Sequence, residues 1–206
     1  MAPIRLCVLV SGYGTILDAM LDAGLEICLV ASDRPCRALA VASDAGVESV
    51  LVDRRDYGGF TKEFDRERYS EELARVLTEH RIDLIAMTGF GTIVTGALHR
   101  AFPGRILNTH PSLLPAFKGW HAVTATLEAG VSETGCTVHV ATEALDDGPI
   151  LAQRRVVVLP EDDEASLHER IKTVERVLYP EVVARVMASL ARGDEPGSVA
   201  GAMEES

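Results

Sequence analysis

The first 110 residues alternate between short apolar runs and segments whose apolar residues recur at helical spacing. The apolar runs, which predict strands, are residues 4–10, 26–31, 49–52, 84–87 and 106–108. Three segments predict helices: one that follows Thr15, one over residues 38–45 and one over residues 64–80. Such alternation is typical of an open, mostly parallel twisted sheet with helices on both faces, so we predict an α/β fold.

The pattern changes after Pro111. Residues 136–141 and 150–159 predict two strands that are joined by an acidic, glycine-containing turn, which indicates an antiparallel addition in the C-terminal part. Residues 165–192 have helical periodicity, interrupted at Tyr179-Pro180, where proline can open a second helix. Glycine, proline, serine and acidic residues predict a flexible tail over 193–206.

The chain length fits one large domain with a sizeable core. We predict a single domain over residues 1–192 of the 206, in two parts over about 1–100 and about 101–192. No apolar stretch approaches the roughly 20 residues that cross a bilayer. The N-terminus lacks the apolar core of a signal peptide, so we expect a cytoplasmic protein without membrane association.

Charge and cysteine usage narrow the partners. The formal charge of −11 gives no general attraction for phosphate backbones, so we expect small-molecule substrates and no nucleic acid. The sequence is compatible with a homodimer as well as with a monomer. The four cysteines lack CxxC spacing and predict buried, reduced thiols. His110, His121 and His139 lack ligand partners at regular spacing, so we predict no metal site.

Gly12-Tyr13-Gly14 separates the first predicted strand from its helix. Backbone N–H groups and the helix dipole at such a turn favour an anion, which predicts a phosphate site, whereas a tight turn without a ligand is the alternative. Asp33 ends the second strand where a ribose-binding acid of a dinucleotide site would lie. Leu17 stands in place of that motif's third glycine and disfavours this alternative.

Asn108 and His110 are two residues apart at the end of an apolar strand, so their side chains leave on the same side. The carboxyl edge of an open α/β sheet is where ligands bind. Taken alone, this pair is also compatible with a histidine that is satisfied by local hydrogen bonds.

Three spaced segments, together with the glycine turn, resemble the phosphoribosylglycinamide formyltransferase family. The segments are NTHPSLLPAF at 108–117, GCTVHV at 135–140 and LDDGPIL at 145–151. The resemblance runs from about residue 4 to 185 and implies a Rossmann-like formyltransferase fold. It implies a nucleotide-binding half over about 1–100 and a catalytic and folate-binding part over about 101–192. It also implies formyl transfer from 10-formyltetrahydrofolate, a co-substrate, to the amine of 5'-phosphoribosylglycinamide, in de novo purine (IMP) biosynthesis.

The resemblance implies a catalytic trio of Asn108, His110 and Asp146. An amine that attacks a formyl carbon develops an oxyanion, and an asparagine amide can donate to it without titrating. A histidine, with an unperturbed pKa near 6.5, can offer the same oxygen a proton or a positive charge. The carboxylate of Asp146 orients the histidine or handles protons through a water. Which member moves which proton stays open.

Ligand contacts are implied in the same way. The ribonucleotide would be held by Gly14, Thr15 and Ile16 at its phosphate, with Lys172, by Glu175 at its ribose, and by Arg66 near its amide. The folate would contact Met87, Ile93 and Val94 and the stretch Ala141, Thr142, Glu143, Ala144, Leu145 and Asp146. Read without the resemblance, Lys172, Glu175 and Arg66 belong to a solvated helix face, and the apolar residues belong to the core.

Four departures from the common pattern of the family concern the ligand loops. Ile16 replaces a polar residue, Gly91-Thr92 replaces a Met-Arg or Met-Lys pair, Lys118 replaces a proline before Gly119, and Asp147 adds a carboxylate beside Asp146. None of them removes a member of the trio. They leave the formyl acceptor less well determined than the formyl chemistry.

Three alternative functions remain. The first is hydrolysis of 10-formyltetrahydrofolate by an enzyme that usually carries an additional N-terminal domain, whereas this chain starts at the first strand. The second is a formyltransferase acting on another amine, such as an amino sugar or initiator methionyl-tRNA, which would call for a C-terminal domain or a basic surface. The third is a homologue that binds ligands without catalysis.

Overall fold

The computed structural model of the chain describes residues 3–199, and the chain forms two compact units, Met1–Ile106 and Leu107–Ser206. The described part of the first unit contains four parallel strands, hydrogen-bonded in the order β3-β2-β1-β4. They are β1 (Leu6–Val10), β2 (Ile27–Ser32), β3 (Ser49–Leu51) and β4 (Leu84–Thr88). The central strand β1 is buried along its whole length, as expected for a strand with neighbours on both sides and helices above and below.

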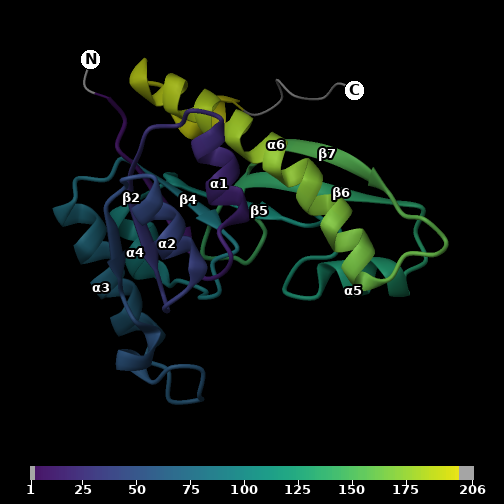
Figure 1. The fold of residues 1–206 in the computed structure, drawn as a ribbon, viewed down its shortest axis with the longest axis horizontal. Coiled ribbons are helices and arrows are strands. Elements are labelled where there is room, and N and C mark those ends of the chain that lie inside the picture. The colour runs from purple at the N-terminus through teal and green to yellow at the C-terminus, as the bar shows by residue number, and fades with distance from the viewer. Residues whose placement is uncertain (1–2, 200–206) are drawn as a thin grey trace. The chain divides into compact units, whose positions relative to one another are not determined.

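Helices connect these strands. The connections are α1 (Thr15–Asp22), α2 (Arg37–Asp44), the short η1 (Arg54–Tyr57) and α3 (Arg66–Glu79), and α4 (Gly96–Ala101) follows β4. From β1 the chain steps outward to β2 and β3, then returns past β1 to β4. Right-handed crossovers in opposite directions put α1 and α2 on one face of these strands and α3 on the other (Figure 1).

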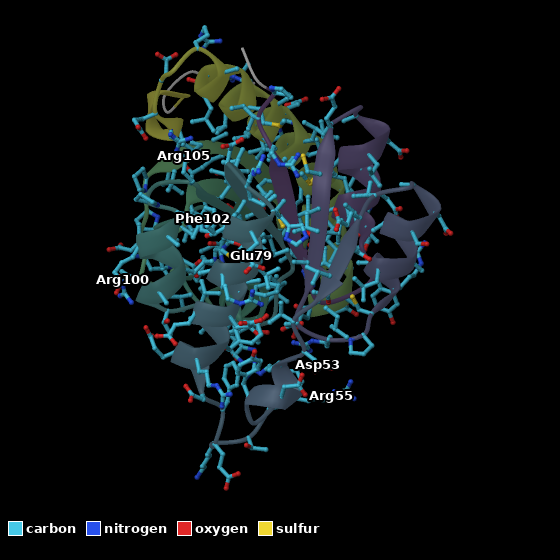
Figure 2. The ribbon with its side chains drawn as sticks, turned by 90° about the vertical axis from the view of Figure 1, so that its left-hand side faces the viewer. Asp53, Arg55, Glu79, Arg100, Phe102 and Arg105 are labelled. Atoms are coloured by element: carbon cyan, nitrogen blue, oxygen red, sulfur yellow. The ribbon has the colours of Figure 1, made fainter. Side chains whose placement is uncertain are left out.

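Side-chain caps explain where two helical segments of this unit, α3 and η1, begin. The Asp65 side chain caps α3 by accepting a hydrogen bond from the Arg68 N–H at 3.0 Å, and Tyr69 and Leu73 lie on its buried face. Asp53 caps η1 in the same way, and Figure 2 shows it beside Arg55, whose guanidinium lies 2.5 Å from the carboxylate.

The second unit is antiparallel. Its strands are the end of β5 (Ile106–His110), β6 (Glu133–Val140) and β7 (Ile150–Val157), with β6 paired to both of the others. The helices are α5 (Ala122–Glu128) and α6 (Glu164–Ala191), followed by the short η2 (Pro196–Val199). Figure 1 shows α6 running along β6 and β7, with α5 beside its first turns.

The predicted interruption of the C-terminal helix at Tyr179-Pro180 is wrong. α6 continues from Glu164 to Ala191 with Pro180 inside it, although proline removes one helical hydrogen bond. Leu178, Tyr179 and Pro180 are all buried, and the Tyr179 hydroxyl donates to the Leu107 carbonyl at 3.0 Å. Burial of this face compensates for the lost bond.

The predicted fold class, an open and mostly parallel α/β sheet with an antiparallel C-terminal addition, is confirmed by the strand pairings. Within residues 3–199, no helix is long and apolar enough to cross a membrane. All four cysteines are free, but only Cys7 and Cys136 are buried. Cys28, the second residue of β2, and Cys36, which directly precedes α2, are partly exposed. The last part of the predicted tail, residues 200–206, lies outside the described residues.

Candidate active site

The end of β5 presents two polar side chains to one place in the second unit. Asn108 and His110 alternate with Thr109, so they share one side of the strand. Asn108 lies directly opposite His139 of β6, and its Nδ2 is 3.3 Å from Nε2 of that histidine. The sequence predicted the shared side of Asn108 and His110 but did not place His139 against Asn108.

Asp146 reaches the same place from the turn between β6 and β7. Its Oδ2 lies 3.3 Å from Nδ1 of His110, and its Oδ1 lies 3.6 Å from Nε2 of His139. All three side chains are almost completely buried. The predicted trio of Asn108, His110 and Asp146 is therefore brought together, with His139 as a fourth member that contacts both Asn108 and Asp146.

Hydrogen bonds distinguish the two histidines. Nε2 of His110 lies 2.8 Å from the Phe117 carbonyl oxygen, and Nδ1 faces the Asp146 carboxylate. Both ring nitrogens therefore face acceptors, and a ring that carries a proton on each nitrogen can donate to both. His139 places Nδ1 at 3.1 Å from the Val140 carbonyl, which leaves Nε2 to accept from the Asn108 amide. Burial lowers the pKa of His139 and favours the neutral ring that this role needs.

The site combines three chemical abilities. The Asn108 amide is oriented by His139, and an amide N–H is a neutral donor for developing negative charge. The His110 imidazole can hold or give a proton beside it, and the Asp146 carboxylate stabilises the charged ring. Such a set suits an acyl-type transfer, in which a carbonyl oxygen gains charge while protons move between two nitrogens.

The glycine turn of the first unit is built around Gly14. Its φ of +79° suits glycine, and a Cβ there would lie 3.0 Å from the Cα and Cβ atoms of Ala38. Gly14 precedes α1 without a side-chain cap, so the backbone N–H groups of the first turn remain for a ligand. Ile16 is buried, so it can offer an anion its backbone only.

Asp33 is engaged within its own unit. Its carboxylate is fully buried and accepts from Arg34 at 2.8 and 2.9 Å and from the Thr92 hydroxyl at 2.7 Å. Burial alone would raise the pKa of Asp33, but the hydrogen bonds from Arg34, Thr92 and Ser11 outweigh it and lower the pKa. A carboxylate so occupied is not available to a ribose, which argues against the dinucleotide alternative.

The remaining predicted contacts divide between the units. In the first unit Arg66 is exposed at the start of α3, Met87 and Val94 are buried, and Ile93 is partly exposed. In the second unit Lys172 and Glu175 are partly buried on α6, Ala141 is buried, and Thr142, Glu143, Ala144 and Leu145 are exposed on the turn that leads to Asp146. Their ligand roles stay predictions.

Glu175 has an unusual environment for a carboxylate. It is partly buried on α6, where the Thr109 hydroxyl of β5 hydrogen-bonds to it and the buried Cys136 of β6 lies close by. The positive charges of Lys172 and Arg176, on its own helix, act to lower the pKa of Glu175. Burial nevertheless raises the pKa of Glu175 to about 7.

The raised pKa predicts a pH-dependent cost in stability. A carboxyl whose pKa rises from 4.5 to about 7 on folding contributes stability below pH 4.5 that is lost between pH 4.5 and 7, by up to about 3 kcal/mol. Glu175→Gln should therefore raise the free energy of unfolding by about 2 kcal/mol at pH 8 and leave it nearly unchanged at pH 4.5.

Urea denaturation across this pH range measures the effect. Glu169→Gln is the matched control, because Glu169 is exposed on the same helix and its pKa is lowered by its hydrogen bond to Arg176. It should give no gain at pH 8. Parallel stability curves for wild type and Glu175→Gln would refute the assigned environment of Glu175.

Comparison with known proteins identifies the class. The sequence profile described as formyl transferase matches residues 4–183, which is most of the chain. The chain therefore belongs to the formyl transferase family. It is 42% identical over 188 residues to phosphoribosylglycinamide formyltransferase of Mycobacterium tuberculosis strain H37Rv, covering 89% of this chain and 85% of that protein.

Two further relatives agree. A crystal structure of glycinamide ribonucleotide transformylase 1 from Symbiobacterium toebii matches with a TM-score of 0.79 and 40% identity, covering 87% of this chain and 85% of that one. The trifunctional purine biosynthetic protein adenosine-3 of Drosophila melanogaster is 38% identical over 196 residues, which are 91% of this chain but only 14% of that protein. The family resemblance and the predicted enzyme class, a formyltransferase, are confirmed.

Proposed function

We propose that this enzyme transfers the formyl group of 10-formyltetrahydrofolate to the primary amine of 5'-phosphoribosylglycinamide. The observation that carries the proposal is the convergence of Asn108, His110 and Asp146 at the end of β5. The relatives named for this activity add support, since two of them are covered over 85% of their length. The reaction belongs to de novo purine synthesis.

The chemistry follows from the contacts within the trio. As the amine attacks the formyl carbon, the formyl oxygen gains negative charge. The Asn108 amide donates to this oxygen, and the positive charge of the protonated His110 ring stabilises it electrostatically. Asp146 stabilises the positive charge of that ring. The attacking nitrogen must lose a proton and the folate nitrogen must gain one, and a water held by Asp146 or His110 can carry it.

The proposed substrate contacts follow the family pattern residue by residue. Gly14, Thr15 and Ile16, with Lys172, hold the phosphate of the ribonucleotide, Glu175 accepts from its ribose hydroxyls, and Arg66 contacts its amide region. The uncapped start of α1 supports the first role, since backbone N–H groups suit an anion. Met87, Ile93, Val94 and residues 141–146 hold the folate.

An assay with purified protein tests the reaction. We expect deformylation of a 10-formyl folate analogue to depend on 5'-phosphoribosylglycinamide, with one formylated ribonucleotide formed for each folate consumed. Turnover without the ribonucleotide would replace the proposal by hydrolysis. Turnover only with another amine would change the acceptor, and inactivity with all of them would indicate a homologue that binds without catalysis.

A further inference from the structure

The segment 117–119 contacts both titratable members of the trio through its backbone. The Phe117 carbonyl lies 2.8 Å from Nε2 of His110, and the Gly119 N–H donates to Oδ2 of Asp146 at 2.9 Å. The same Oδ2 faces Nδ1 of His110. The position of this one short segment therefore sets the orientation of the His110 ring and the Asp146 carboxylate relative to each other.

Hydrogen bonds fix the chain before this segment, whereas the segment itself is partly exposed. The Ser112 hydroxyl donates to the Ala116 carbonyl at 2.6 Å, and the Leu114 N–H donates to the Thr137 hydroxyl at 3.0 Å. Beyond Ala116 the chain turns outward, and the Trp120 side chain is 63% exposed. Apolar burial therefore contributes little to holding residues 118–120.

Backbone strain is present on both sides of the contact. Phe117 has a φ of +53° and Asp146 a φ of +51°, a region that costs a residue with a side chain roughly 1 kcal/mol or more. Each strained residue is followed at once by a charged one, Lys118 and Asp147. These two side chains form an ion pair across the gap. The attraction between Lys118 and Asp147 therefore opposes movement of Phe117 and Asp146 toward a less strained backbone conformation.

We propose that Lys118 and Asp147 are positioning residues, whose ion pair holds segment 117–119 against the turn at 142–149 and so aligns Asp146 with His110. The effect of this ion pair on turnover rests on the proposed function, whereas its effect on the position of segment 117–119 does not.

The expected effect is modest and falls on turnover. The Lys118 and Asp147 side chains are 36% and 60% exposed, so their attraction is screened, and its loss should lower kcat about threefold to fivefold. KM for either substrate should change less than about twofold, because neither side chain belongs to the proposed substrate contacts. In the wild type, high salt should lower kcat toward the value of the variants.

A set of four variants tests the pair by formyl-transfer kinetics. Lys118→Met and Asp147→Asn should lose similar activity, and the double variant should lose no more than either one, since one interaction is removed in each case. The charge-exchanged variant, Lys118→Asp with Asp147→Lys, should recover at least half of the wild-type kcat. Additive losses, or equal kcat in all variants, would overturn the proposal.

A matched control and a second measurement separate this inference from the proposed function. Arg155→Met breaks another exposed ion pair, with Glu133, at the far end of the β6–β7 ladder from His139, and should leave kcat unchanged. Amide hydrogen exchange at Gly119 should be about fivefold faster in Lys118→Met than in wild type. If exchange at Gly119 is unchanged, the ion pair does not hold segment 117–119, and the inference is refuted even when no turnover is detected. If the wild type is inactive but exchange is faster in the variant, only the proposed function is refuted.

Discussion

His110→Ala and Asp146→Ala are each expected to lower kcat for formyl transfer by at least about 100-fold. Removing the His110 ring takes away the positive charge that can stabilise the developing oxyanion beside Asn108. Removing the Asp146 carboxylate takes away the negative charge 3.3 Å from that ring and the acceptor of the Gly119 N–H. Single-turnover kinetics with saturating substrates measure the chemical step directly.

Two further variants make the first prediction specific. Asp146→Asn keeps the shape and the acceptor for Gly119 but lacks the charge, so it should be almost as slow as Asp146→Ala. Asp147→Asn removes a neighbouring carboxylate that faces Lys118 instead of His110, and it should lose only about fivefold. A rate near that of the wild type in His110→Ala or Asp146→Ala would refute the catalytic assignment.

Periodicity was sufficient for most elements of the fold. The first apolar run places β1 within two residues of its observed start, because a buried central strand must be apolar at every position. The spacing of Tyr69 and Leu73 predicts α3 for the corresponding reason. Pro180 misled the prediction, because the local cost of proline is visible in the sequence and the burial of Tyr179 against β5 is not.

The candidate site was predictable in its members but not in its contacts. The spaced motifs name Asn108, His110 and Asp146, and the strand register explains why the first two share a side. That His139 faces Asn108 depends on the pairing of β5 with β6, which no local pattern specifies. The Lys118–Asp147 pair depends on two irregular loops, in which Phe117 and Asp146 have a positive φ. Hydrophobic periodicity does not predict such loops.

Gly148 links the fold to the chemistry through the shape of the turn. The turn is closed by a hydrogen bond from the Val140 N–H to the Pro149 carbonyl at 2.9 Å. A Cβ on Gly148 would lie 1.7 Å from the Val140 carbonyl oxygen and 2.9 Å from its carbon. Backbone atoms of β6 cannot move aside as a flexible side chain can, so the turn itself would have to shift.

Gly148→Ala is therefore expected to lower kcat on the order of 100-fold, because a displacement of about 1 Å in a reacting group has an effect of that size. Asp146 lies only two residues before Gly148, and it must stay within reach of both His110 and the Gly119 N–H. Forcing the methyl group into the turn should also lower the free energy of unfolding by about 1–3 kcal/mol.

Kinetics and thermal denaturation of the same preparation measure both effects. Gly197→Ala is the control, since a Cβ there meets no atom within 4 Å and the residue lies in η2, away from the trio in sequence. It should match the wild type in kcat and in melting temperature. If Gly148→Ala kept the wild-type kcat, the turn would not hold Asp146, and alignment of the carboxylate would have to come from segment 117–119 alone.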